Sequence, residues 1–166
     1  MTEPNCEEFV WRTHGYINDY IRLADAKAGA LFAIFGALIG VLVHQWAEGD
    51  ESATWWRIAL FASALSSALT VIALAIDVVR PRVDLGNTRV GSRTLGYIYW
   101  KHIRARNREE YEHGVRALDK ADLIREVTSH TWEIAGIAET KYKKLKYAFL
   151  LSYIGLFLCL LGVATL

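Results

Sequence analysis

The sequence predicts an all-α integral membrane protein with three transmembrane helices and a small helical cytoplasmic region. Of its 166 residues, 53% are hydrophobic and 22% are charged, so the two kinds must be segregated along the chain. Three uncharged runs, over 28–47, 58–76 and 147–166, carry much of the apolar share. Each has about 20 residues, enough for a helix to cross a hydrocarbon core of about 30 Å. A chain this short cannot surround three such helices with amphipathic ones, which disfavours a water-soluble fold.

These runs set the predicted boundaries of the chain. We expect a cytoplasmic amphipathic helix over 1–27, membrane helices over 28–47, 58–76 and 147–166, a short external loop over 48–57, and a cytoplasmic helical region over 77–146. The first run follows a polar, acidic segment and not a short basic one, so it differs from a cleavable signal peptide. We therefore expect it to stay in the mature chain.

The positive charges predict the orientation. Lysine and arginine number 3 before the first run, 1 in the short loop and 15 between the second and third runs. Basic segments beside membrane helices tend to remain in the cytoplasm. The N-terminus is therefore predicted to be cytoplasmic and the C-terminus to lie on the other side.

Apolar spacing predicts the helices outside the membrane. Residues Phe9, Val10, Tyr16, Ile17, Tyr20 and Leu23 recur at helical intervals and predict a helix that continues into the first span. The segment 95–103 is apolar and aromatic; we favour a short helix there, with a strand as the alternative. From Glu109 the pattern predicts one long helix that runs without interruption into the third span. The apolar stripes exceed what so small a region can cover, so a homo-oligomer is expected.

One face of the first span is lined by small residues: Gly29, Ala33, Gly36 and Gly40. The last two form a GxxxG motif. Small side chains let membrane helices approach closely, and this drives their association where lipid removes the hydrophobic incentive. Packing within one copy and packing between copies are equally compatible with this face.

The connection after the second span holds the candidate ligand site. Arg89 and Arg93 lie in a glycine-containing loop over 86–93 that could hold a phosphate, although it lacks the spacing of a Walker motif. Tyr97, Tyr99 and Trp100 follow, and their aromatic faces could stack on a base. The plainer alternatives are a basic loop facing anionic lipid headgroups and a small packed aromatic core.

The sequence gives little support for catalysis. The histidines outside the spans have no nucleophile or carboxylate at a diagnostic spacing, and no CxxC or HExxH motif suggests a metal site. Cys6 and Cys159 are expected to lie far apart, which argues against a structural disulfide. We therefore expect no enzyme activity, no metal, no cofactor and no nucleic-acid partner.

Several segments together resemble a known family. They are 21–28 (IRLADAKA), 80–82 (RPR), 95–103 (LGYIYWKHI) followed by Glu110 and Tyr111, and 138–145 (AETKYKKL). Their order and spacing, over residues 16–160, resemble the transmembrane effectors of Pycsar, the bacterial antiphage system whose pyrimidine cyclase makes a cyclic mononucleotide signal.

The resemblance implies a membrane effector of the bacterial inner membrane. Such a protein would sense cyclic CMP or cyclic UMP, impair membrane integrity and cause abortive infection, with the pyrimidine cyclase as its functional partner. Its C-terminus would then be periplasmic. Two alternatives stay open: a constitutive membrane scaffold or accessory subunit, and a holin-like protein that needs no signal.

Overall fold

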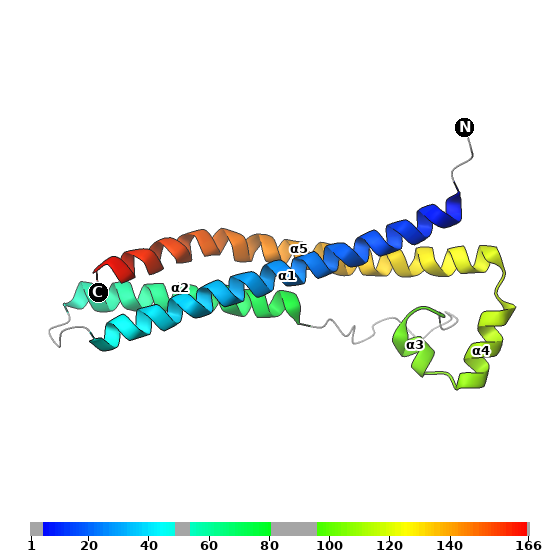
Figure 1. Cartoon of the computed structure of the whole chain (residues 1–166), viewed down its shortest axis with the longest axis horizontal. Helices are drawn as coiled ribbons and strands as arrows, with labels where there is room; N and C mark the ends of the chain where they lie inside the picture. Colours follow the sequence, from blue (N-terminus) through cyan, green and yellow to red (C-terminus); the bar gives the residue numbers. More distant parts are fainter. Residues whose placement is uncertain (1–4, 49–53, 81–95, 166) are drawn as a thin grey trace. The chain divides into compact units, whose positions relative to one another are not determined.

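The computed structural model describes residues 5–48, 54–80 and 96–165, and within these ranges the chain forms five helices and no strand. The helices are α1 (Cys6–Glu48), α2 (Trp55–Val79), α3 (Trp100–Arg104), α4 (Arg108–Ala117) and α5 (Lys120–Thr165) (Figure 1). Three of them, α1, α2 and α5, are long and apolar enough to cross a membrane. The predicted all-α class with three membrane helices is confirmed.

The described residues form two compact units. Those within 1–21 and 82–138 make up the polar unit, and those within 22–81 and 139–166 make up the membrane unit. Helices α1 and α5 contribute to both, because each is a single helix that starts in the polar unit and ends in the membrane unit. The predicted continuity of the N-terminal helix with the first span is therefore confirmed.

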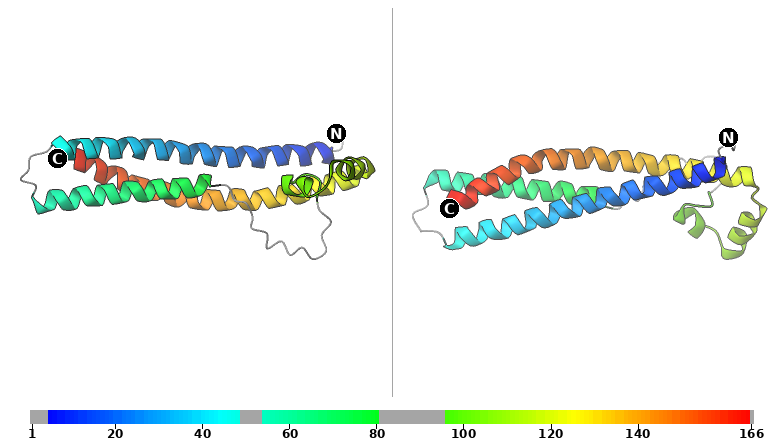
Figure 2. Two further views of the ribbon diagram at one scale, coloured as in Figure 1. Left: turned by 90° about the horizontal axis from the view of Figure 1, so that it is seen from below. Right: turned by 45° about the horizontal axis from the view of Figure 1, so that its top comes forward.

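In the membrane unit, α1, α2 and α5 lie side by side (Figures 1 and 2). The buried residues of α2 alternate in steps of four and three: Ala64, Ala68, Val71, Ala75 and Val78. The same alternation continues along α5: Leu145, Ala148, Ser152, Gly155, Cys159 and Gly162. A repeat that averages 3.5 residues keeps one stripe of each helix facing its neighbours, as in left-handed helical bundles.

Two glycines of α5 lie against large side chains of α1. A Cβ atom on Gly155 would lie 3.0 Å from the Phe35 ring, and one on Gly162 would lie 3.1 Å from a methyl group of Leu42. Phe35 is 2% exposed and Leu42 is fully buried. The absent side chains therefore make room for large residues of α1, which close the core between the helices.

The polar unit combines the first residues of α1 and α5 with α3 and α4. Asn107 caps α4 in a reciprocal capping box: its side chain accepts from the Glu110 amide at 2.7 Å, and its own amide donates to the Glu110 carboxylate at 3.3 Å. Lys120, the first residue of α5, forms an ion pair with Glu7 of α1 at 2.8 Å. These contacts fix where α4 and α5 begin.

The prediction of one uninterrupted helix from Glu109 is wrong. Helix α4 ends at Ala117, Leu118 has an extended backbone with φ −70° and ψ 130°, and α5 begins at Lys120. The cause is Asp119, whose side chain accepts from the Asp122 amide at 2.7 Å and so starts a new helix. In the segment 95–103 the favoured helix is confirmed from Trp100 onward, whereas 97–99 form a bend.

The packing of α5 on α2 predicts a specific disulfide. A Cβ atom on Gly162 would lie 3.8 Å from the Cβ atom of Ala64, which is the usual separation in a disulfide. With Cys6 and Cys159 replaced by serine, Ala64→Cys with Gly162→Cys should lose both free thiols on mild oxidation. The measurement is thiol labelling by a maleimide reagent.

Leu161 provides the matched control, since it is adjacent in sequence and 41% exposed. Ala64→Cys with Leu161→Cys should keep its thiols under the same conditions. Equal oxidation of the two pairs would contradict the observed contact between α2 and α5.

Candidate functional site

Tyr97 lies just before α3 and is contacted by residues of α4, of α5 and of the segment between α3 and α4. Its amide donates to the Glu126 carboxylate of α5 at 2.8 Å, and its carbonyl accepts from the Tyr111 hydroxyl of α4 at 3.3 Å. The Arg106 guanidinium lies 4.3 Å from the Tyr97 ring centroid, within reach of a cation–π interaction. The ring is therefore part of a packed core, which agrees with the plainer alternative for this residue.

A glycine in α4 makes room for that ring. A Cβ atom on Gly114 would lie only 2.5 Å from the Tyr97 hydroxyl oxygen and 2.6 Å from a ring carbon, closer than atoms can approach. Glycine lowers helix propensity, yet α4 carries it at the point of contact. The Tyr97 ring can therefore occupy this position only because Gly114 has no side chain.

Tyr99 joins a cluster of histidines that the sequence did not identify. Its ring centroid lies 5.1 Å from that of His102 and 6.3 Å from that of His130 on α5. His130 in turn lies 5.4 Å from His14 on α1. Residues 14 and 130 are distant in the chain, so no local spacing could have indicated this contact.

The same cluster determines the protonation of His14. Burial lowers the pKa of His14 below its usual value, and the charge that His130 would carry lowers it further. The Nε2 atom of His14 and the Nδ1 atom of His130 are buried without a hydrogen-bond partner. The two rings pack α1 against α5 within the polar unit.

Trp100 is the candidate aromatic residue that remains accessible. It is 59% exposed at the start of α3, and the Lys101 ammonium lies 5.7 Å from its ring centroid. An open indole face beside a cation suits a flat, anionic ligand. Arg89 and Arg93, the predicted phosphate contacts, lie outside the described residues.

Two ion pairs join the helices of the membrane unit. Lys141 of α5 donates to the Asp25 carboxylate of α1, and Lys144 of α5 donates to the Asp77 carboxylate of α2. Sequence reasoning did not predict the pairing of Lys141 with Asp25. The 3–4 repeat was the available signal, because it places Lys141 at a core position of α5.

The small-residue face of α1 points away from the rest of the chain. All four members are exposed: Gly29, Ala33, Gly36 and Gly40. A Cβ atom on any of the three glycines would meet nothing within 4 Å. Among the described residues, this face therefore takes no part in packing within one copy.

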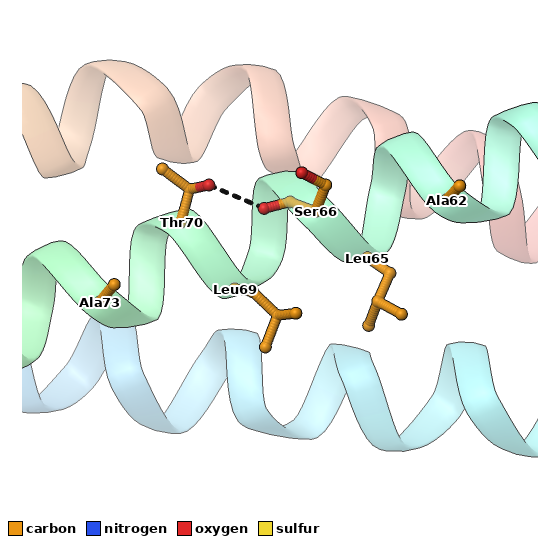
Figure 3. A pocket seen from close by; sticks show the side chains of 6 residues that line it. All are labelled: Ala62, Leu65, Ser66, Leu69, Thr70 and Ala73. Atoms are coloured by element: carbon orange, nitrogen blue, oxygen red, sulfur yellow. Dashed lines mark hydrogen bonds between the residues drawn. The ribbon is translucent and has the colours of Figure 1, made fainter.

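A shallow hollow of about 520 Å³ lies on the outer face of α2 (Figure 3). It is lined by Ala62, Leu65, Ser66, Leu69, Thr70 and Ala73. The Thr70 hydroxyl donates to the Ser66 carbonyl at 2.8 Å, so this hydroxyl already has a hydrogen-bond partner within the helix. The hollow thus combines four small side chains with two leucines on an exposed face of a membrane-spanning helix.

The residues that the structure describes contain no group of three His, Cys, Asp or Glu side chains able to hold a metal ion. Cys6 is exposed and Cys159 is buried, and both are free thiols. The candidate site is therefore built from aromatic rings, histidines and cations.

Comparison with known proteins gives two matches of nearly full length. The family model described as "Pycsar effector protein domain" matches residues 9–166. The chain is also 25% identical over 155 residues to the "Pycsar effector protein SaPycTM" of Staphylococcus aureus, which covers 93% of this chain and 92% of that protein. No solved structure matches significantly.

The contact between Gly114 and Tyr97 predicts opposite effects for two glycine substitutions. Gly114→Ala should destabilise the polar unit by about 1–3 kcal/mol, because the added methyl group displaces the ring. Gly136→Ala should be neutral or stabilise by up to about 1 kcal/mol, because a Cβ atom there meets nothing within 4 Å and alanine favours the helix. Thermal unfolding of the purified chain in detergent measures both; a stable Gly114→Ala variant would contradict the packing of Tyr97.

Proposed function

Because this chain belongs to the Pycsar effector family, we propose that it is a membrane effector activated by a cyclic pyrimidine mononucleotide, cyclic CMP or cyclic UMP. Activation would impair the integrity of the bacterial inner membrane and cause abortive infection. Family membership places the chain in antiphage defence. One observation supports the proposed activation and its effect on the membrane: α1 and α5 each belong to both the polar unit and the membrane unit.

The shared helices supply a physical route from signal to membrane. A ligand bound to the polar unit would act on a unit that includes the first residues of α1 and α5, and the same two helices form most of the membrane unit. A shift at one end of such a helix would move its other end. The ligand must bind one arrangement of these helices more tightly than another, since equal affinity would change nothing. The signal would come from a pyrimidine cyclase, the functional partner.

We place the base of the nucleotide on Trp100 and its phosphate on Arg89 and Arg93. Trp100 supports this placement because it is exposed beside Lys101, whereas Tyr97 is packed under Arg106. Tyr97 and Tyr99 would then set the position of Trp100 by holding the bend that leads into α3. The effector would act by binding and not by catalysis.

The proposed orientation has the polar unit in the cytoplasm and the C-terminus in the periplasm. Its support is the distribution of lysine and arginine, with 15 of these residues between the second and third predicted spans. A cytoplasmic polar unit would face the compartment in which nucleotides are made. The C-terminal end of α5 would then lie at the periplasmic face.

We further propose that the effector is a homo-oligomer whose copies meet through the small-residue face of α1. This face is exposed, and each of its glycines is open to a neighbour. The outer hollow of α2 would suit it as the opposing surface, because its two leucines could pack against the glycines of α1. Contact between two different faces can repeat around a ring.

The first prediction for function concerns membrane potential in cells that express the chain. Supplying the correct cyclic nucleotide should depolarise the membrane, and Trp100→Ala should require a roughly 5- to 150-fold higher nucleotide concentration, the loss expected for one stacked base. Arg89→Ala with Arg93→Ala should abolish nucleotide binding and leave membrane insertion intact. The measurements are a potential-sensitive dye and equilibrium binding to the purified chain.

Trp132→Ala is the matched control, because Trp132 is an exposed tryptophan of α5, at 79% exposure, outside the proposed site. It should respond to the nucleotide as the wild type does. Depolarisation without any nucleotide would favour the holin-like alternative, and no depolarisation with either nucleotide, despite confirmed membrane insertion, would favour the scaffold.

A second prediction concerns assembly. Gly36→Leu should lower the oligomeric state in membranes, because the larger side chain keeps neighbouring helices apart. Ile34→Phe is the control: it adds bulk at an exposed position of the same helix, outside the small-residue face. Counting photobleaching steps of labelled copies in lipid discs measures the number of chains; equal counts for both variants would remove the small-residue face as the interface.

A further inference from the structure

Lys141 is a charged residue in a core position. It occupies the 3–4 repeat of α5 between Ala138 and Leu145, and all three residues are buried. Its side chain is only 6% exposed and donates to the Asp25 carboxylate of α1. The side chain of Asp25 is 35% exposed, so this pair has one buried member and one partly hydrated member.

The second ion pair of the membrane unit has a different character. Lys144 and Asp77 have side chains that are 33% and 44% exposed, so both charges retain water. Pairs of this kind contribute little to stability. The two pairs involve the same helix and the same residue types, which makes Asp77 and Lys144 an internal control for Asp25 and Lys141.

The surroundings of Lys141 explain why its charge needs Asp25. Leu145 is 3% exposed and Ala148 is fully buried in the next positions of the repeat, so the neighbouring core positions are apolar. The nearby cation Lys27 lies 6.0 Å from the Tyr142 ring centroid. A buried ammonium group that loses its carboxylate keeps the cost of desolvation without the compensating attraction.

An apolar residue would fill this position at least as stably. Replacing a buried ion pair by well-packed apolar side chains is often neutral or stabilising, whereas removing one partner is strongly destabilising. A buried ion pair thus adds little stability compared with an apolar contact, but it suits two helices that must move apart.

We propose that the Asp25–Lys141 pair is the latch that keeps α5 seated on α1 in the resting membrane unit, and that its separation is the step that admits water between the two helices. This inference rests on the proposed function, because it identifies how the effector is held inactive. The latch lies within the first residues that α1 and α5 contribute to the membrane unit. Both residues lie close to the point where their helix leaves the polar unit, so a shift of either helix there would reach the pair early.

The asymmetry of the pair predicts opposite effects for its two members. Asp25→Asn leaves a buried ammonium group uncompensated, so it should depolarise cells without nucleotide, with the open fraction raised about tenfold or more. Lys141→Met removes the buried charge and leaves a partly hydrated carboxylate, so it should hold the helices together and reduce the response to nucleotide. Asp25→Asn combined with Lys141→Met should behave as Lys141→Met does.

The experiment compares these three variants and Asp77→Asn in cells, with and without cyclic CMP or cyclic UMP. Thermal unfolding of the purified full chain in detergent is measured in parallel. The melting temperature should fall for Asp25→Asn, recover in the double variant and stay near the wild-type value for Asp77→Asn. Recovery in the double variant also shows that the asparagine itself is tolerated.

The outcomes separate the latch from the proposed function. If the wild type responds to nucleotide and Asp25→Asn behaves like Asp77→Asn, the latch is overturned. If Asp25→Asn and Lys141→Met both open the membrane, the pair is an ordinary stabilising contact and the latch is likewise overturned. If the wild type responds to neither nucleotide, the proposed signal is wrong; the latch then stands only if Asp25→Asn alone depolarises the cells and the double variant does not.

Discussion

The close approach of α5 to α1 and α2 is the constraint on which the membrane unit depends. Small or absent side chains at Gly155, Cys159 and Gly162 let the helices meet, and the 3–4 alternation keeps the same stripe of α5 facing inward over its length. In lipid, this packing replaces the hydrophobic effect that holds a soluble core together. The same alternation carries Lys141 into the interior, where its charge must be compensated.

The polar unit is stabilised by contacts of a different kind. Rings from α1, α5 and the bend before α3 pack on one another, and burial lowers the pKa of His14 in this cluster. Main-chain groups at Gly96 and Tyr97 are bound by the side chains of Arg106 and Glu126. The bend is therefore fixed from several sides, and Trp100 extends from a rigid support.

The sequence predicted the three helices long and apolar enough to cross a membrane, because long uncharged runs have few physical alternatives. It predicted the break between α4 and α5 poorly, since apolar spacing continues through Leu118 and the start signal at Asp119 was outweighed by that periodicity. The contacts of His14 with His130 and of Asp25 with Lys141 join residues more than a hundred positions apart in the chain. Such contacts depend on which faces of two helices meet, and hydrophobic pattern alone does not specify that choice.

The glycines of α1 and α5 show the same limit, because their positions in the fold cannot be read from composition. The glycines at 29, 36 and 40 of α1 are exposed, whereas those at 155 and 162 of α5 are buried against Phe35 and Leu42. Composition does not distinguish these two sets of glycines, but only the glycines of α5 pack in the core of one copy. Because the inner set already satisfies the packing of the chain, the outer set is free to contact a neighbour without disturbing the fold. Packing within one copy and contact between copies would therefore depend on different glycines of the spans.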